Sequence, residues 1–463
     1  MKKNKIKVLC FFDSQKGRDV EILIPLIVFA EKYLNCVFEY SILWDIHAIY
    51  QKKPDLVLLP NTIGSEFHYR AAKYAYENNI KVFALISEGN FRTNGTFDYW
   101  GYNKDKNFFQ EYICHWSQRT LNYLKREEKA FAHKMVLTGG LGFDRYKIYK
   151  FIDKISFLNE YNLNNFEKII GYAGWAFGKI YNKQGREELI ANGYPESKFE
   201  WLENQMYNVE DILKRAIVNN PDILFILKRH PNEANPSITR HDLNEMVRLK
   251  DYNNVLYLHG NENIHDLINV SDIWTGFETT TCLEAWMMGK NETLLLNPDP
   301  DFNRDDIHKG SLILKTYKEF QDYIDEYYQY NRIRQCHSTT IKQSRDRLIK
   351  NTIGFGDGLN HIRAGYYLKK TIDNINVNVK KKIYLNLRYF IMYILLYGGR
   401  VFYNKKIFLK LPKFKKTVWI FENFRFNEFF TLKSKYSTFL NEFYISKKIE
   451  QLVDNKTEWG KIL

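Results

Sequence analysis

Short apolar segments alternate with helical segments along most of the chain, and this alternation restricts the fold more than any other feature. Helical patterns with apolar residues about 3.6 positions apart occupy 21–34 and 64–79. Apolar runs of strand length surround them, at 5–13, 37–44, 54–60 and 81–87. Strands that alternate with helices predict a parallel, Rossmann-like sheet. Residues 102–133 look mostly helical, and 134–140 is expected to be a late strand of the same sheet.

A second series of strands and helices begins after a segment of linker composition at 162–168. Its strands are expected at 168–178, 222–231, 254–260, 271–277 and 292–298, and helices between them at 207–219, 263–270 and 280–288. The pattern predicts an α/β chain with two tandem Rossmann-like domains, residues 1–163 and 164–360, that face each other across a cleft. Ligands of such sheets lie beyond the carboxyl ends of the strands.

Several functional classes lack their sequence signatures. The five cysteines are scattered without a CxxC, which excludes a disulfide framework and the common zinc patterns and fits a reduced compartment. The histidines form no HExxH, so we expect no metal site, and no P-loop or GxSxG elbow is present. The clustered glycines at 137–144 lack GxGxxG spacing. The first residues are predicted to be a strand of a cytoplasmic protein rather than a signal peptide.

The positive charge is concentrated in the last part of the chain. Residues 361–463 contain 21 Lys and Arg against 7 Asp and Glu, which accounts for the whole formal charge of +14. This extension is aromatic, and its most apolar stretch, 383–399, is too short for a membrane span and contains Arg388. We expect a mostly helical extension that holds the protein peripherally on the anionic inner face of the cell membrane. Packing on the protein itself is the main alternative, and nucleic acid is the least favoured partner.

The strongest local motif is LKRHPNE, residues 227–233. Lys228, Arg229 and His230 follow an apolar strand, where they are placed to bind phosphate oxygens of a donor nucleotide. Pro231 disfavours helical geometry at His230 and ends the strand sharply. The alternative is an ordinary surface loop.

A second motif joins a short strand to a helix in SDIWTGFETTTCLEAWMMGK, residues 271–290. The hydroxyls of Thr279, Thr280 and Thr281 lie at a predicted helix N-terminus, which is suited to phosphate. Glu284, one turn later, can accept hydrogen bonds from a ribose. Capping of the helix by a threonine is the alternative, and it is compatible with phosphate binding.

A third motif is FALISEGNF, residues 83–91, in which Glu88 and Gly89 follow a buried strand. A carboxylate shielded from water there can have a raised pKa and act as a general base. Asp98 lies in a loop predicted on the same cleft rim. Gly174, in the glycine-rich segment 171–178, allows close approach of a ligand. An ordinary polar turn is the alternative for the Glu88 segment.

Taken together, these motifs resemble GT-B glycosyltransferases of bacterial surface-polysaccharide synthesis, over roughly residues 5–350. The related groups are capsule Kdo transferases, CDP-glycerol glycerophosphotransferases and bacterial sialyltransferases. In the sialyltransferases an acidic-acidic-Gly motif supplies the base, an HP motif contacts CMP, and a Ser/Thr motif holds its phosphate. The matching positions here are Glu88 with Gly89, His230 with Pro231, and the three threonines 279–281. The first acidic position of that pattern is Ser87 in this chain.

The resemblance implies a transfer reaction without a cofactor, in which the nucleotide-sugar is a substrate. The implied donor is CMP-linked, with a nonulosonic acid or Kdo-type sugar, and the acceptor is a capsule or lipopolysaccharide glycan, free or lipid-linked. Metal independence is expected because preorganised hydrogen-bond donors can stabilise a leaving phosphate. The alternatives are a CDP-glycerol polyol-phosphate transferase, a GT-B-like sugar-nucleotide epimerase, and a non-catalytic scaffold for glycan assembly.

Overall fold

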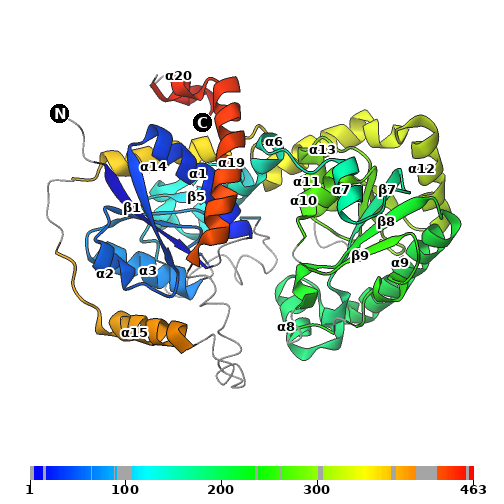
Figure 1. Cartoon of the computed structure of the whole chain (residues 1–463), viewed down its shortest axis with the longest axis horizontal. Coiled ribbons are helices and arrows are strands. Elements are labelled where there is room, and N and C mark those ends of the chain that lie inside the picture. The colour runs from blue at the N-terminus through cyan, green and yellow to red at the C-terminus, as the bar shows by residue number, and fades with distance from the viewer. Residues whose placement is uncertain are drawn as a thin grey trace. The chain divides into compact units, whose positions relative to one another are not determined.

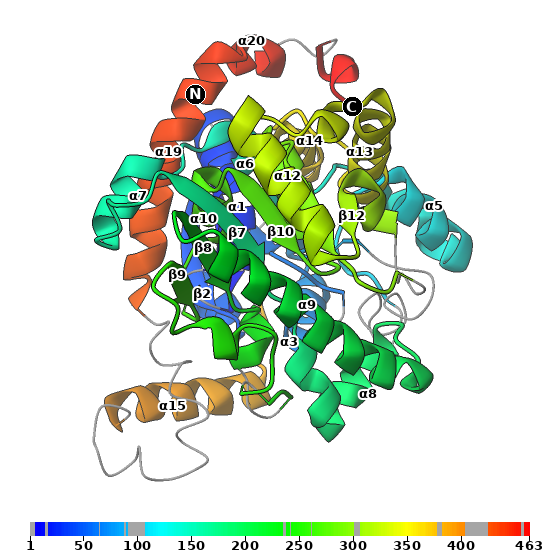
Figure 2. The same cartoon turned by 90° about the vertical axis from the view of Figure 1, so that its right-hand side faces the viewer.

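The chain forms two compact units, each built on a six-stranded parallel sheet (Figures 1 and 2). Unit 1 comprises Met1–Phe91, Trp100–Tyr149 and Lys350–Leu463, and unit 2 comprises Arg92–Tyr99 and Lys150–Ile349. The computed structural model describes the chain except for residues 1–4, 14–16, 64, 88, 91–106, 235–237, 241, 261, 301–305, 377–381, 403–424 and 455–457.

The sheet of unit 1 has the order β2-β1-β3-β4-β5-β6. Its strands are β1 Ile6–Phe12, β2 Cys36–Ile42, β3 Leu56–Leu59, β4 Lys81–Ala84, β5 Ile113–His115 and β6 Met135–Leu137. The helices that connect them are α1 Arg18–Tyr33, α2 Ala48–Lys52, α3 Glu66–Glu77 and α5 Gln118–Glu127. All four residues of β3 are buried. Continuous apolar strands of this kind are typical of parallel sheets covered on both faces.

One strand of unit 1 is missing from the sequence prediction. Residues 102–133 were expected to be mostly helical, but β5 lies within them and pairs in parallel with β6. All three residues of β5 are buried. A strand this short and this buried shows no alternation of polar and apolar residues, so periodicity does not reveal it. The helix α5 and a 3-10 helix at Lys129–Lys134 account for the helical part of the prediction.

The sheet of unit 2 has the order β12-β11-β10-β7-β8-β9. Its strands are β7 Lys168–Ala173, β8 Ile223–Lys228, β9 Val255–Leu258, β10 Ile273–Gly276, β11 Thr293–Leu296 and β12 Leu312–Leu314. Its helices are α7 Lys154–Glu160, α8 Lys183–Ala191, α9 Phe199–Asn219, α10 Ile264–Val270, α11 Thr281–Met287, α12 Tyr317–Tyr330 and α13 Thr339–Thr352, of which the last ends in unit 1. Figure 2 shows α9 and α12 side by side across one face of this sheet.

The end of the chain returns to unit 1 as helices. They are α14 Asn360–Asp373, α15 Leu387–Phe402, α19 Asn427–Ser446 and α20 Ile449–Asp454. Both α14 and α19 pack against α1 (Figure 1), and α19 buries Phe429, Leu440 and Tyr444. The extension is therefore mostly helical, as predicted. In the part of the chain that the structure describes, none of these helices has the length and apolar character needed to cross a membrane.

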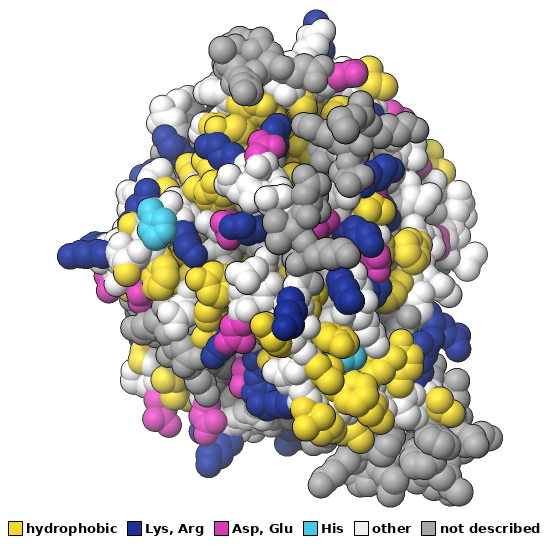
Figure 3. Space-filling model, turned by 90° about the vertical axis from the view of Figure 1, so that its left-hand side faces the viewer, with side chains coloured by type: hydrophobic (Ala, Val, Ile, Leu, Met, Phe, Trp, Pro, Cys, Tyr) yellow, Lys and Arg dark blue, Asp and Glu magenta, His cyan; other side chains and the backbone are white. Residues whose placement is uncertain are grey.

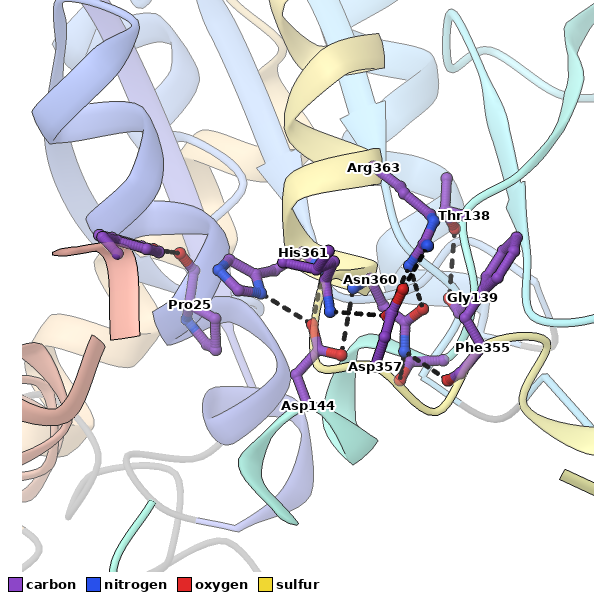
Figure 4. Close-up of polar contacts among 12 residues, drawn as sticks. Pro25, Thr138, Gly139, Asp144, Phe355, Asp357, Asn360, His361 and Arg363 are labelled. Atoms are coloured by element: carbon purple, nitrogen blue, oxygen red, sulfur yellow. Dashed lines mark hydrogen bonds and ion pairs between the residues drawn. The ribbon is translucent and has the colours of Figure 1, made fainter. Parts of the chain in front are cut away.

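The start of α14 is fixed by the carboxylate of Asp144, the residue just before the short helix α6, Arg145–Ile148 (Figure 4). Asp144 accepts hydrogen bonds from the backbone N–H groups of Asn360 and His361, at 3.1 and 2.7 Å. Its Oδ2 also lies 2.8 Å from Nδ1 of His361. Asn360 donates to the carbonyl oxygen of Gly140 at 3.2 Å. Gly139 has φ +81°, and a Cβ there would lie 1.9 Å from Oδ1 of Asn360. Gly139, one of the clustered glycines at 137–144, thus makes room for α14.

Candidate functional site

Three of the predicted motifs lie beyond neighbouring strands of the second sheet. The strands β8, β7 and β10 are adjacent, and Ala173, at the end of β7, pairs with Lys228 of β8 and with Gly276 of β10. The three strands therefore end at one level, and the loops 174–178, 229–233 and 277–280 leave from the same edge. The chain builds outward from β7 to β9 and then resumes at β10 on the opposite side of β7. A reversal of this kind is the usual place for a ligand in an open α/β sheet.

The histidine of the HP motif is held by the backbone of its own turn. Its Nδ1 accepts a hydrogen bond from the backbone N–H of Asn232 at 3.1 Å. An accepting Nδ1 carries no proton, so the hydrogen of the neutral ring is on Nε2. Pro231 opens a 3-10 turn whose residue Glu233 donates its N–H to the carbonyl oxygen of His230 at 3.0 Å. The half-buried His230 thus has an N–H donor at Nε2.

The two cations before this histidine interact with the loop that follows the neighbouring strand β9. Lys228 is buried, and its Nζ lies 2.8 Å from Oε2 of Glu262 and 2.7 Å from the carbonyl oxygen of Gly260. Arg229 is half-buried and donates to the carbonyl oxygen of His259 at 2.9 Å. The charge of Lys228 is thus matched inside the protein. This ion pair holds the β8 and β9 ends together rather than leaving an unpaired cation at the edge.

The threonine turn after β10 has a constrained backbone. Glu278 has φ +41°, a left-handed conformation that non-glycine residues rarely adopt. Thr279 Oγ1 lies 2.9 Å from Thr281 Oγ1 and accepts the N–H of Thr281 at 3.2 Å, so it satisfies a backbone donor at the start of α11. Thr281 Oγ1 also accepts from Nε1 of Trp274 at 2.8 Å. Thr280 is the N-cap residue and is exposed, but its side chain makes no capping bond. Backbone strain of this kind is concentrated at functional sites.

Aromatic side chains pack beneath these loops. The ring centroids of Trp175 and Phe277 lie 5.8 Å apart, and those of Phe177 and Phe277 lie 5.1 Å apart. Tyr194 donates its hydroxyl to the carboxylate of Glu278. These contacts join the loop after β7 to the loop after β10. A rigid base of this kind keeps the polar groups of the loops in place before a ligand arrives.

Two buried carboxyl groups hold the loop after β7, and sequence reasoning did not single them out. Glu245 accepts from the hydroxyl of Tyr172 and from the backbone N–H of Trp175, both at 3.0 Å. Glu233 accepts from Asn244 Nδ2 at 2.8 Å and from the N–H of Gly178 at 3.4 Å. Burial raises the pKa of both carboxyl groups, and the charge of Glu245 raises the pKa of Glu233 further. Glu233 directly follows HPN in the motif, whereas Glu245 has no comparable signal.

The remaining predicted residues of unit 2 are Gly174 and Glu284. A Cβ on Gly174 would lie 2.4 Å from Cε of Met246 and 3.0 Å from the carbonyl oxygen of Lys228. Protein atoms therefore already require glycine at this position. Glu284 is half-buried in the first turn of α11.

The predicted base segment belongs to unit 1. Gly89 is buried against an indole ring, since a Cβ there would lie 2.4 Å from Cγ of Trp116. Nε1 of Trp116 donates to the carbonyl oxygen of Ile86 at 2.7 Å. Glu88 and Asp98 lie outside the described residues. Among the described residues, no group of His, Cys, Asp and Glu side chains is arranged to hold a metal ion.

Comparison with known proteins gives the fold. No family model and no curated protein matches the chain. A protein from Listeria monocytogenes named as a UDP-N-acetylglucosamine 2-epimerase has a similar structure, with a TM-score of 0.52 and 14% identity over 82% of this chain and 100% of that one. The S. aureus MnaA–UDP co-structure matches with a TM-score of 0.50 and 13% identity, over 82% of this chain and 100% of its own. The fold is GT-B-like. This chain adds a helical C-terminal region to that fold, and the region packs within unit 1.

Proposed function

We propose that the chain is a glycosyltransferase that moves a sugar from a CMP-activated donor to a bacterial surface glycan. The observation that carries the proposal is the common edge of β8, β7 and β10, where the HP loop and the threonine turn leave the sheet. The GT-B-like fold adds support, and one structure with this fold was solved with UDP. The donor sugar is proposed to be a nonulosonic acid or a Kdo-type sugar, on the resemblance of the motifs.

The roles follow from the hydrogen-bonding capacity of the loops. His230 donates from Nε2 to the donor phosphate, since its Nδ1 is already engaged by Asn232. The turn 279–281 contributes a hydroxyl donor, and Arg229 supplies positive charge. Glu284 accepts hydrogen bonds from the ribose. CMP leaves as a phosphate monoester, so fixed donors and a nearby cation stabilise the charge that develops on it.

Glu88 is proposed as the general base that deprotonates the acceptor hydroxyl, with Asp98 as the next candidate. The proposal rests on the motif that follows β4, in which Ser87 and Gly89 are both buried. A carboxylate that is shielded from water has a raised pKa. A base near neutral pKa takes a proton efficiently at neutral pH.

Calorimetric titration of the full-length protein with CMP, CDP and UDP tests the donor class. The proposal predicts that CMP binds most tightly. A polyol-phosphate transferase would also release CMP, from CDP-glycerol, so turnover of CDP-glycerol in place of a CMP-sugar would favour that alternative. Preference for UDP would contradict a CMP-linked donor. Binding of CMP without turnover of any CMP-sugar would favour a non-catalytic role in glycan assembly.

A sugar-nucleotide epimerase is the second candidate, because the Listeria monocytogenes structure of the same fold is named as one. An epimerase needs no acceptor, so the two activities separate in one experiment. UDP-N-acetylglucosamine is incubated with the protein alone and followed by proton NMR. The transferase proposal predicts an unchanged spectrum, and appearance of the C2 epimer would contradict it.

A further inference from the structure

The helix α15 carries an apolar face toward solvent, the reverse of an ordinary surface helix. Its exposed apolar residues recur at helical spacing, and they are Leu387 (65% exposed), Ile391 (49%), Ile394 (51%), Leu395 (68%) and Val401 (69%). Figure 3 shows the left-hand side of Figure 1, where hydrophobic side chains gather near the lower edge with Lys and Arg beside them. Exposed apolar patches on this scale mark interaction sites.

The opposite face of α15 is anchored to unit 1, so the apolar face is held outward. Tyr389 packs against Tyr74 with ring centroids 5.1 Å apart, and Tyr393 lies 5.1 Å from the ring of His47. The segment before the helix is tied down as well. Tyr384 donates its N–H to Asn78 Oδ1 at 2.7 Å, and its carbonyl oxygen accepts from the Tyr74 hydroxyl at 2.6 Å. The exposure of this face is thus a property of the packed helix.

The chain around α15 is strongly basic. Residues 374–421 contain no Asp or Glu. The cations of this segment include Lys382 and Arg388, both exposed, and Arg400 at the end of the helix. Such a combination of an apolar face with flanking cations matches the two parts of an anionic bilayer surface, the acyl chains and the charged headgroups.

Other occupants fit this surface less well. A second copy of the chain would bring two surfaces of equal positive charge together, in a protein of net charge +14. Nucleic acid would satisfy the cations but would leave the leucine and isoleucine side chains in water. The helix has 16 residues, about 24 Å of length, which is less than a bilayer core of about 30 Å. It suits a position in the plane of the membrane surface.

We propose that α15 docks on an anionic lipid bilayer, with the side chains of Leu387, Ile391, Ile394, Leu395 and Val401 inserted at the headgroup boundary. This narrows the membrane site that was expected from the charge of the whole extension, because α14 and α19 bury most of their apolar residues within unit 1. The inference is independent of the donor nucleotide.

The test compares two matched double variants of the full-length protein. Leu387→Ser/Leu395→Ser removes two side chains of the α15 face, and Ile155→Ser/Ile445→Ser removes two side chains of similar exposure elsewhere (73% and 77%). Each is sedimented with vesicles of phosphatidylcholine containing about 30 mol% phosphatidylglycerol and with pure phosphatidylcholine, at about 0.1 M salt. Thermal unfolding and far-ultraviolet circular dichroism of each variant test whether the fold is intact.

The wild type and the control pair are expected to bind the anionic vesicles and to bind pure phosphatidylcholine weakly. For the α15 pair, the partition coefficient onto anionic vesicles is expected to fall by about tenfold or more, because each substituted leucine loses its apolar contact with lipid. Equal vesicle binding by both pairs, or no binding by the wild type, would overturn the proposal. The proposal would also be overturned if the protein formed a dimer without lipid, or bound single-stranded RNA, and the α15 substitutions abolished that association.

Discussion

Glu245 accepts a hydrogen bond from the backbone N–H of Trp175 at 3.0 Å, so a fully buried carboxyl group fixes the loop after β7. Its partner in the same region, Glu233, fixes the other end of that loop through the N–H of Gly178. The pKa of each carboxyl is raised by burial. The loops proposed to bind the donor are thus positioned by groups whose charge state depends on pH.

Glu245→Gln should change the pH dependence of stability. A carboxyl group with a raised pKa in the folded state binds its proton more tightly there than in the unfolded chain, whose value is near 4.5. The contribution of Glu245 to the free energy of unfolding is therefore largest at low pH, and it is lost as the pH rises through the folded pKa. Gln keeps an acceptor oxygen for Tyr172 and Trp175 and removes the titration. Between pH 5 and pH 8 the free energy of unfolding in urea should decrease less for the variant than for the wild type, by roughly 1–3 kcal/mol.

Glu200→Gln is the matched control for this measurement, because Glu200 is exposed on α9. Its stability should follow the wild-type pH curve. If Glu245→Gln also ran parallel to the wild type, the buried carboxyl would not be a source of the pH dependence.

Gly139→Ala should weaken the attachment of α14. The new Cβ would lie 1.9 Å from Oδ1 of Asn360, in a residue with φ +81°. Gly289→Ala has the same backbone cost, at φ +87°, but its Cβ meets nothing within 4 Å. The left-handed backbone costs both variants about 1–2 kcal/mol. The unfolding temperature should fall clearly further for Gly139→Ala than for Gly289→Ala. Equal decreases would mean that Asn360 moves aside freely.

The sequence predicted the parallel sheets well because most of their strands are continuous apolar runs of four to seven residues, such as β1 and β8. It missed β5 and β12, each of three residues, because such short buried strands have no usable periodicity. The common edge of β7, β8 and β10 follows from strand order, which the local pattern does not contain.

The site was predictable in part. His230 and the threonine turn follow strands directly, so their place at the sheet edge was accessible from the sequence. The ion pair of Lys228 with Glu262 was not, because Lys228 ends β8 whereas Glu262 lies in the loop after β9, and no local signal connects them. Glu245 likewise acts through contacts with residues about 70 positions away in the sequence.

Glu88→Gln should separate binding from catalysis. Gln has the size of Glu but does not take up a proton at neutral pH, so donor affinity should remain close to the wild-type value. Transfer to an acceptor glycan should slow by roughly 10²–10⁴-fold, the usual effect of losing a general base. Single-turnover rates measure this directly. A wild-type rate would move the role to Asp98, whose Asp98→Asn variant is the companion measurement.

The most direct test of the proposed site is the affinity of CMP for the His230→Ala variant. His230 is expected to donate one hydrogen bond from Nε2 to the phosphate, and a bond to a charged group is worth about 1.5–3 kcal/mol, or about 10- to 150-fold in affinity. His259→Ala is the matched control, an exposed histidine at the end of the neighbouring strand β9. Calorimetric titration should show the loss for His230→Ala alone. Unchanged CMP affinity in a folded His230→Ala protein would contradict the assignment of the donor site to the HP loop.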